Sequence, residues 1–233
     1  MKKIAIMQPT YLPWVGYFAL IDRVDEFIFL DSVQFERRSW QQRNRIKGPS
    51  GEMMLTVPVH KAPRDKLLIC NAKIDYTSKF VRKHINALQH AYGKTPFFNK
   101  YKTIIFDALN KKPPLLADLN IEIILKVAKI LGIQTIMLRS SELAARGKKD
   151  ELLFNICRER DAQIYISPPG SVKYLNTSRF FNKDVFPLQY HKYIPQPYDQ
   201  LNGDCVLYLA IIDLLFNAGP DSLEIIRSGV DKQ

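Results

Sequence analysis

Residues 3–31 read KIAIMQPTYLPWVGYFALIDRVDEFIFLD. The apolar residues 4–7 and 27–30 predict two short buried strands, at 4–7 and 26–31, and the spacing of apolar residues predicts a helix at 15–23. A strand, a helix and a second strand in so few residues form a compact βαβ unit, in which the two strands are parallel. This stretch therefore predicts a parallel sheet.

The remainder of the chain repeats the alternation of strands and helices. Strands are predicted at 55–59, 134–138, 162–166 and 186–190, with 68–74 paired to the first of them, and helices at 77–92, 96–109, 116–131, 149–160 and 206–217. Thr77 or Ser78 is expected to cap the first of these helices, and Gly219 to end the last. We predict one doubly wound or nucleotide-binding α/β domain over residues 1–233, with a helical subregion at 77–131.

The composition favours a globular protein with an anionic partner. The chain has 46% hydrophobic residues and carries 34 Lys and Arg against 23 Asp and Glu, a formal net charge of +11. No window approaches 18 uninterrupted apolar residues, and Gln8 and Pro9 interrupt the first apolar run. We therefore expect neither a membrane span nor a signal peptide, and a cytoplasmic location. The three cysteines are widely spaced, which argues against a disulfide framework and a structural zinc site.

One edge of the predicted sheet gathers the polar segments of the chain. Four segments rich in polar or flexible residues follow predicted strands, at 8–16, 31–34, 140–141 and 167–174. In doubly wound sheets, ligands bind beyond the carboxyl ends of the strands. We therefore expect these segments to lie together and to form the binding site.

The first segment, residues 8–17, is stiffened by two prolines and leads into the predicted helix. Gly16 lies near the start of that helix, where free backbone N–H groups attract phosphate and a glycine permits close approach. The alternative is a merely stiff turn that places Trp14 in the core. The ligand-binding candidates of this segment are Gln8, Thr10, Tyr11, Trp14, Gly16 and Tyr17.

The second segment, residues 31–45, combines two aromatic residues with four arginines and several amides. It overlaps a stretch, 32–54, that fits neither period and is expected to be irregular and functional. Arginines bind phosphate bidentately, and aromatic rings stack on a base or a sugar. We favour a small anionic ligand over a polynucleotide, for which no reading module is present, and over an inert solvated loop. The candidates are Asp31, Gln34, Arg38, Trp40, Arg43, Asn44 and Arg45.

Both segments resemble the signature of the WbqC-like family. The similarity runs through QPTYLPWVGYF (8–18), DSVQF (31–35), RSWQQRNRI (38–46), LTVPV (55–59), SSEL (140–143) and IIDLLFNAG (211–219), and so covers nearly the whole chain. The chain departs from the family pattern at Cys205, Leu207 and Ala210. The family is associated with bacterial surface-polysaccharide (O-antigen) gene clusters. The resemblance implies transfer of glycine or another acyl group to an amino sugar or its nucleotide conjugate.

Pro9-Thr10 and Gln34-Phe35 are also similar to motifs that follow the first two strands of pantothenate synthetases. This resemblance implies a Rossmann-like, HUP-type nucleotide-binding core with helices on both faces and an additional α-helical insertion. In those enzymes two histidines of the first turn hold ATP, whereas Trp14 and Tyr17 stand at the matching positions here. ATP with Mg²⁺ is therefore a hypothesis, in which a carboxylate such as glycine forms an acyl-adenylate that a sugar amine then attacks.

Under that hypothesis the catalytic residues are Asp31, Gln34, Arg38 and Arg43. These two arginines, together with Arg45, would balance phosphate charge. Gln34 would hold the carboxylate, and Asp31 would bind the amine or a magnesium ion. Catalysis of this kind needs positioning and charge stabilisation but no side-chain nucleophile.

Residues at later strand ends complete the predicted site. Ser140 and Ser141 would donate to phosphate oxygens, with a helix cap as the alternative, and Ser167 and Tyr174 would contact substrate. The four histidines are dispersed along the sequence and indicate no catalytic pair. The alternative function is a non-catalytic module that binds a nucleotide sugar or nucleic acid through the basic loop 34–47.

Overall fold

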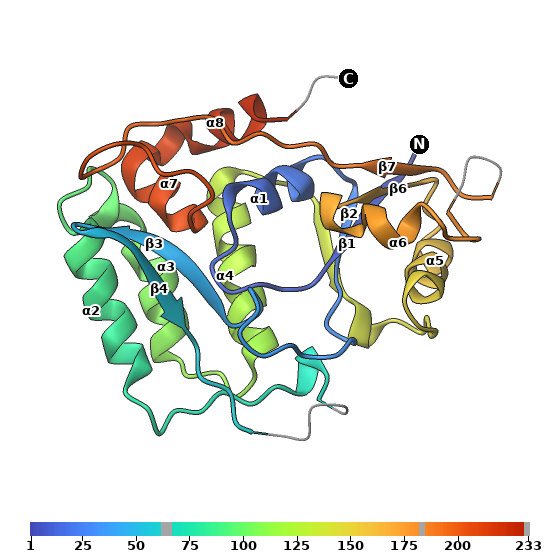
Figure 1. Cartoon of the computed structure of the whole chain (residues 1–233), viewed down its shortest axis with the longest axis horizontal. Helices are drawn as coiled ribbons and strands as arrows, with labels where there is room; N and C mark the ends of the chain where they lie inside the picture. The colour runs from blue at the N-terminus through green and yellow to red at the C-terminus, as the bar shows by residue number, and fades with distance from the viewer. Residues whose placement is uncertain (62–66, 182–184, 231–233) are drawn as a thin grey trace.

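Figure 1 shows the computed structural model of the chain, which describes residues 1–61, 67–181 and 185–230. Five parallel strands form the main sheet in the order β5-β2-β1-β6-β7. Their bounds are β1 (Lys3–Met7), β2 (Glu26–Phe29), β5 (Ile136–Arg139), β6 (Ile164–Ser167) and β7 (Leu188–Tyr190). The predicted parallel α/β fold is confirmed.

The strand order places a topological switch beside β1. The chain leaves β1 through α1 (Val15–Asp22) and enters β2, and β5 pairs with the far side of β2. After β5 the chain returns through α5 (Asp150–Glu159), so that β6 pairs with the opposite side of β1. Because the connections diverge at such a switch, the carboxyl ends of β1 and β6 leave room for a ligand.

Alternate residues of the strands face two separate cores. Ala5 and Phe27 pack in the larger core, which also contains residues of α1 and α4 (Leu116–Leu131). Ile4 and Ile6 point to the other face, where they pack with residues of α5. A sheet whose two faces are both apolar must be covered on both sides. The expectation of helices on both faces is confirmed.

A group of helices covers one side of the sheet and extends beyond it (Figure 1). It comprises α2 (Phe80–Tyr92), α3 (Phe98–Asn110), α4, α7 (Ile211–Ala218) and α8 (Ser222–Ser228). A short helix, α6 (Val172–Leu175), follows β6 on the other side. In the ranges that the structure describes, no helix combines the length and the apolar character of a membrane span.

The expectation that residues 32–54 are irregular is wrong for the second half of this stretch. β3 (Arg43–Gly48) and β4 (Gly51–Thr56) form an antiparallel hairpin that is separate from the main sheet. Asn44 and Ile46 are both buried, but one of them is polar. Because Asn44 is polar and basic residues flank both positions, a pattern that scores hydrophobicity alone does not detect the strand alternation.

The stretch predicted to pair with residues 55–59 is mostly not a strand. It contains a 3₁₀ turn, η1 (Ile69–Asn71), and one isolated bridge between Val59 and Ile74. Ile69 and Ile74 are buried in the larger core. The spacing of apolar residues in 68–74 therefore reflects the burial of a turn and not a strand.

The largest differences from the predicted helix starts are at α7 and α2, which both begin later. α7 does so because Ala210 is held in an extended bridge to Trp14. α2 has no side-chain cap at its start. The hydroxyl of Thr77 donates instead to the Asp75 carboxylate at 2.6 Å, and the hydroxyl of Ser78 to the Asp75 carbonyl at 3.4 Å. These local hydrogen bonds to Asp75 use the hydroxyl groups that were expected to cap the helix.

Candidate functional site

The structure brings the first and second segments together beyond the carboxyl end of β1. The backbone N–H of Tyr11 donates to the carbonyl of Trp40 at 3.0 Å. The side-chain amide of Gln41 donates to that of Gln8 at 2.9 Å. These contacts join the two segments into one continuous wall.

Two buried asparagines hold this wall in place. Asn44 donates to the carbonyl of Leu12 at 2.6 Å and so supports the positive φ of 46° at Leu12. Asn120 on α4 donates to the carbonyls of Pro9 at 3.2 Å and Gln41 at 2.8 Å, one from each segment. Sequence reasoning missed Asn120. The sequence signal for such a residue is a single amide side chain in a mostly apolar helix, because a buried amide needs hydrogen-bond partners.

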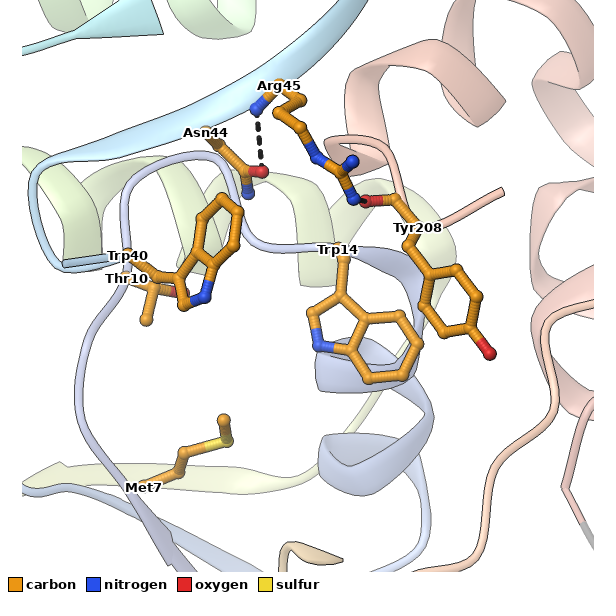
Figure 2. Close-up of a pocket in the computed structure, with 7 residues that line it drawn as sticks. All are labelled: Met7, Thr10, Trp14, Trp40, Asn44, Arg45 and Tyr208. Atoms are coloured by element: carbon orange, nitrogen blue, oxygen red, sulfur yellow. Dashed lines mark hydrogen bonds between the residues drawn. The ribbon is translucent and has the colours of Figure 1, made fainter. Parts of the chain in front are cut away.

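A cavity of about 280 Å³ opens against this wall, and we call it the tryptophan pocket. Trp14 and Trp40 stand on opposite sides of the gap, with both indole nitrogens turned toward it (Figure 2). Neither indole N–H has a hydrogen-bond partner among the described residues, so both donors are available to a ligand. The pocket is lined by Met7, Thr10, Trp14, Trp40, Asn44, Arg45 and Tyr208 (Figure 2).

Arg45 supplies the positive charge of the tryptophan pocket. Its guanidinium carbon lies 5.9 Å from the centroid of the Trp40 ring. One terminal nitrogen donates to Glu52 at 2.8 Å, and the other approaches the Tyr208 carbonyl at 3.5 Å. The Nε atom is buried without a partner in the described part of the chain. A planar cation beside an aromatic ring suits a phosphate or a carboxylate.

A second cavity of about 630 Å³ adjoins the first, and we call it the histidine pocket because His191 lines it. Its lining includes Gln8, which follows β1, and Ser171, which follows β6. The two pockets share Met7, Thr10, Trp14 and Trp40, and together we call them the cleft. The cleft therefore lies at the switch between β1 and β6, where sheets of this class bind their ligands.

The pattern that defines the WbqC-like protein family matches residues 8–225. The chain belongs to this family. It is 34% identical over 229 residues to the uncharacterized protein Rv1507c of Mycobacterium tuberculosis (strain ATCC 25618 / H37Rv), and the match covers 97% of this chain and 98% of the relative. No solved structure matches the chain. The resemblance drawn from the sequence motifs is thereby confirmed at the level of the family.

Most of the substrate-binding residues predicted for this WbqC-like protein line the cleft. Gly16 does so in a way that differs from the expectation. A Cβ atom at Gly16 would lie 2.3 Å from the ring of Trp14, so the missing side chain makes room for the indole rather than for phosphate. The predicted residues in the lining are Gln8, Thr10, Trp14, Gly16, Tyr17, Trp40, Asn44 and Arg45.

Other predicted substrate-binding residues lie elsewhere. Tyr11 is buried, and its hydroxyl lies 2.9 Å from Nδ1 of His84, a ring whose pKa burial lowers to about 4. Ser167 is also buried, and its hydroxyl is paired with that of Ser171. The side chain of Tyr174 lies outside the described residues.

Asp31, Ser140 and Ser141 meet at the carboxyl ends of β2 and β5, but in a closed cluster. The buried Asp31 carboxylate accepts hydrogen bonds from Arg139 Nε at 2.8 Å and from the Ser140 hydroxyl at 3.2 Å. The backbone N–H and the hydroxyl of Ser141 each donate to it at 2.9 Å. We call these four residues the Asp31 cluster. They tie β2 to β5 and occupy the carboxylate that was expected to bind an amine or Mg²⁺.

Gln34, Arg38 and Arg43 also lie away from the lining of the cleft. Gln34 and Arg38 are exposed, and Gln34 forms a backbone bridge with Leu68. Arg43 begins β3 and is half-buried, with no partner for its Nε in the described part of the molecule. None of the residues proposed as catalytic from the sequence therefore lines either pocket.

The residues of the cleft do not fit a protein-held metal ion. Across the described residues, no group of three or more His, Cys, Asp or Glu side chains is placed to hold one. The Asp31 carboxylate is occupied by its own cluster. A Mg²⁺ ion would therefore depend mainly on the phosphates of a bound nucleotide.

Sequence reasoning also missed His191, which directly follows β7. Its side chain is only 2% exposed, and both ring nitrogens lack a hydrogen-bond partner among the described residues. A histidine after a short strand has no distinctive local pattern. Only its burial, its missing partners and its place in the pocket mark it.

Proposed function

We propose that this WbqC-like protein transfers an acyl group, such as glycyl, to the amine of a nucleotide-linked amino sugar bound in the cleft. The observation that carries the proposal is the tryptophan pocket at the switch between β1 and β6. Two facing indole rings with free N–H groups lie there beside the guanidinium of Arg45. Rings stack on sugars and bases, and the adjacent cation suits a diphosphate.

The dimensions of the cleft agree with this class of ligand. Its two pockets have volumes of about 280 and 630 Å³, and sites for small molecules typically span ~300–1,000 Å³. The shared residues Met7, Thr10, Trp14 and Trp40 connect a part that contains Arg45 to a larger part whose lining includes uncharged polar residues such as Gln8 and Gln41. A nucleotide sugar has the same division, with a base and phosphates at one end and hydroxyl groups at the other.

The chemistry asks the protein mainly to position its substrates. The sugar amine attacks the acyl carbon of an activated donor, a C–N bond forms, and the bond to the activating group breaks. That group leaves with the electron pair, and the amine loses a proton. With ATP as co-substrate, the donor carboxylate first attacks the α-phosphorus and releases pyrophosphate. Holding the reactants in this geometry supplies much of the rate enhancement.

The proposal is tested with ATP, labelled pyrophosphate and a panel of small carboxylates that includes glycine. We expect carboxylate-dependent exchange of label into ATP. We also expect a mass increase of one acyl group on UDP-glucosamine when all substrates are present. Trp40→Ala should reduce both signals, whereas Leu125→Ala, an exposed apolar change on α4, should leave them unchanged. Absence of exchange and of acylated product from the wild-type protein would count against the enzyme.

One observation favours a second function, a non-catalytic module that binds a nucleotide sugar or a polynucleotide. Asp31, Gln34, Arg38 and Arg43 all lie away from the lining of the cleft. Binding of UDP-glucosamine without exchange or product would support the nucleotide-sugar form. Binding of a polynucleotide that weakens steeply with added salt would support the other form.

A further inference from the structure

His191 is a buried polar side chain whose ring nitrogens are both unpaired among the described residues. Buried polar groups in folded proteins nearly always have a hydrogen-bond partner, because burial without one costs free energy. His191 lines the histidine pocket, so a ligand bound there can supply the hydrogen-bond partners that the ring nitrogens lack. The imidazole therefore points to a ligand group that forms hydrogen bonds.

The ring of His191 is held in one orientation. Its backbone N–H donates to the Ser167 carbonyl at 2.8 Å, which fixes the end of β7 against β6. The imidazole stacks on Tyr193, with ring centroids 5.9 Å apart and planes 18° apart. Tyr193 in turn meets the edge of Trp14 at 5.5 Å. A continuous row of rings thus connects His191 to the tryptophan pocket.

The surroundings keep this imidazole uncharged at neutral pH. Burial, together with the positive charge of Arg23, lowers the pKa of His191 to about 4. A contact with the backbone of Gly16, which falls short of a hydrogen bond, acts in the opposite direction. A neutral imidazole offers one donor and one acceptor. A hydroxyl group has the same pair, whereas a phosphate needs donors and positive charge. The cationic side chain of the cleft is Arg45, in the other pocket.

We propose that His191 binds a hydroxyl group of the sugar, so that the sugar lies in the histidine pocket and the phosphates extend toward Arg45. Gln8 lies in the same lining, and its side-chain amide nitrogen, which has no partner among the described residues, offers a further donor to the sugar. This orientation rests on the proposed nucleotide-sugar ligand. It makes His191 a residue that selects the sugar and Arg45 a residue that binds the phosphates.

The test compares the affinities of UDP-glucosamine and UDP for the wild-type protein and for His191→Phe, measured by calorimetry. In His191→Phe, loss of one hydrogen-bonded pair should lower the affinity for UDP-glucosamine by about tenfold. The affinity for UDP should stay within about twofold of the wild-type value. His191→Asn keeps a donor and an acceptor at shorter reach, so its loss should be smaller. Equal weakening of both ligands, or of neither, would overturn the assignment of His191.

Nuclear magnetic resonance gives a second measurement that uses the wild-type protein and therefore does not require that a variant folds. His84 is the matched control, because it is similarly buried but is bonded to Tyr11. Addition of UDP-glucosamine should shift the ring nitrogen signals of His191 and not those of His84, and UDP alone should shift neither. Movement of the His191 signals by UDP alone would overturn the orientation. If the wild-type protein binds neither ligand, the proposed function fails together with this inference.

Discussion

The amino ends and the carboxyl ends of the strands in the main sheet form two edges that differ in whether their polar groups have hydrogen-bond partners. At the amino ends of the strands, the Glu26 carboxylate accepts hydrogen bonds from Arg160 Nε at 2.9 Å and lies 2.7 Å from Lys2 Nζ. At the carboxyl ends of β1 and β6, His191 and two indole N–H groups have no partners in the described part of the chain. Satisfied polar groups stabilise one edge, and unpaired ones leave the other able to bind.

The carboxyl edge is itself divided. Beyond β2 and β5, the Asp31 cluster closes the edge with a saturated carboxylate. Beyond β1 and β6, the cleft remains open. Polar residues at strand ends therefore do not by themselves indicate a site. What separates the two halves is whether the protein already satisfies its own donors and acceptors.

The largest expected effect is the loss of the Asp31 cluster. Asp31→Ala leaves Arg139 with one of its two carboxylate partners and leaves the serine donors unpaired, so the free energy of unfolding should fall by about 3–5 kcal/mol. Urea denaturation measures this. The control is Asp118→Ala, which removes the more exposed partner of the same arginine and should cost about 0–1 kcal/mol. Equal losses from the two variants would show that the cluster is not a structural tie.

The next effect follows from the contact between Gly16 and Trp14. The Cβ of Gly16→Ala would lie 2.3 Å from the indole, so the ring must move at a cost of about 1–3 kcal/mol. Tryptophan fluorescence should change, and UDP-glucosamine should bind more weakly. Gly170→Ala meets no atom within 4 Å and should change stability by no more than about 0.5 kcal/mol. Unchanged fluorescence in Gly16→Ala would contradict the close packing.

A pH-dependent effect is expected at the closed amino edge. The hydrogen bonds from Arg160 and Lys2 hold the pKa of Glu26 below its usual value, although burial acts against them. Glu26→Gln should therefore cost about 1–2 kcal/mol at pH 7. Because the pKa is lowered on folding, this contribution is complete above the usual pKa and is lost as the pH falls through the folded pKa. Urea denaturation between pH 7 and 3 checks this, and a cost that stays constant with pH would refute it.

The smallest expected effect on stability comes from the open half of the carboxyl edge. Trp40 is 51% exposed, so Trp40→Ala should change the free energy of unfolding by no more than about 0.5–1 kcal/mol. The same variant should lower the affinity for UDP-glucosamine by about tenfold, because a stacking surface and a free N–H are lost. Thermal melting and calorimetry measure the two quantities. A large fall in stability with unchanged affinity would make Trp40 a structural residue.

Local patterns predicted much of the sheet and part of the cleft. The strand predicted at 4–7 lies within β1, and the strand predicted at 26–31 begins with β2 but extends two residues beyond its end. Both were recognised because burial of a short strand on both faces favours consecutive apolar residues. The hairpin of β3 and β4 was missed because Asn44 occupies an inward position. The amide satisfies carbonyls of the first segment, a purpose that no hydrophobicity pattern records.

The sequence by itself determined the family and the parallel α/β fold, because periodicity and motifs are local properties, and it predicted that the first and second segments lie together. The tertiary structure alone separated the residues that face the cleft from those that do not. It closed Asp31 into a cluster and left His191 buried without a partner. Whether a polar group is satisfied depends on atoms contributed by distant parts of the chain, so only the folded arrangement decides it.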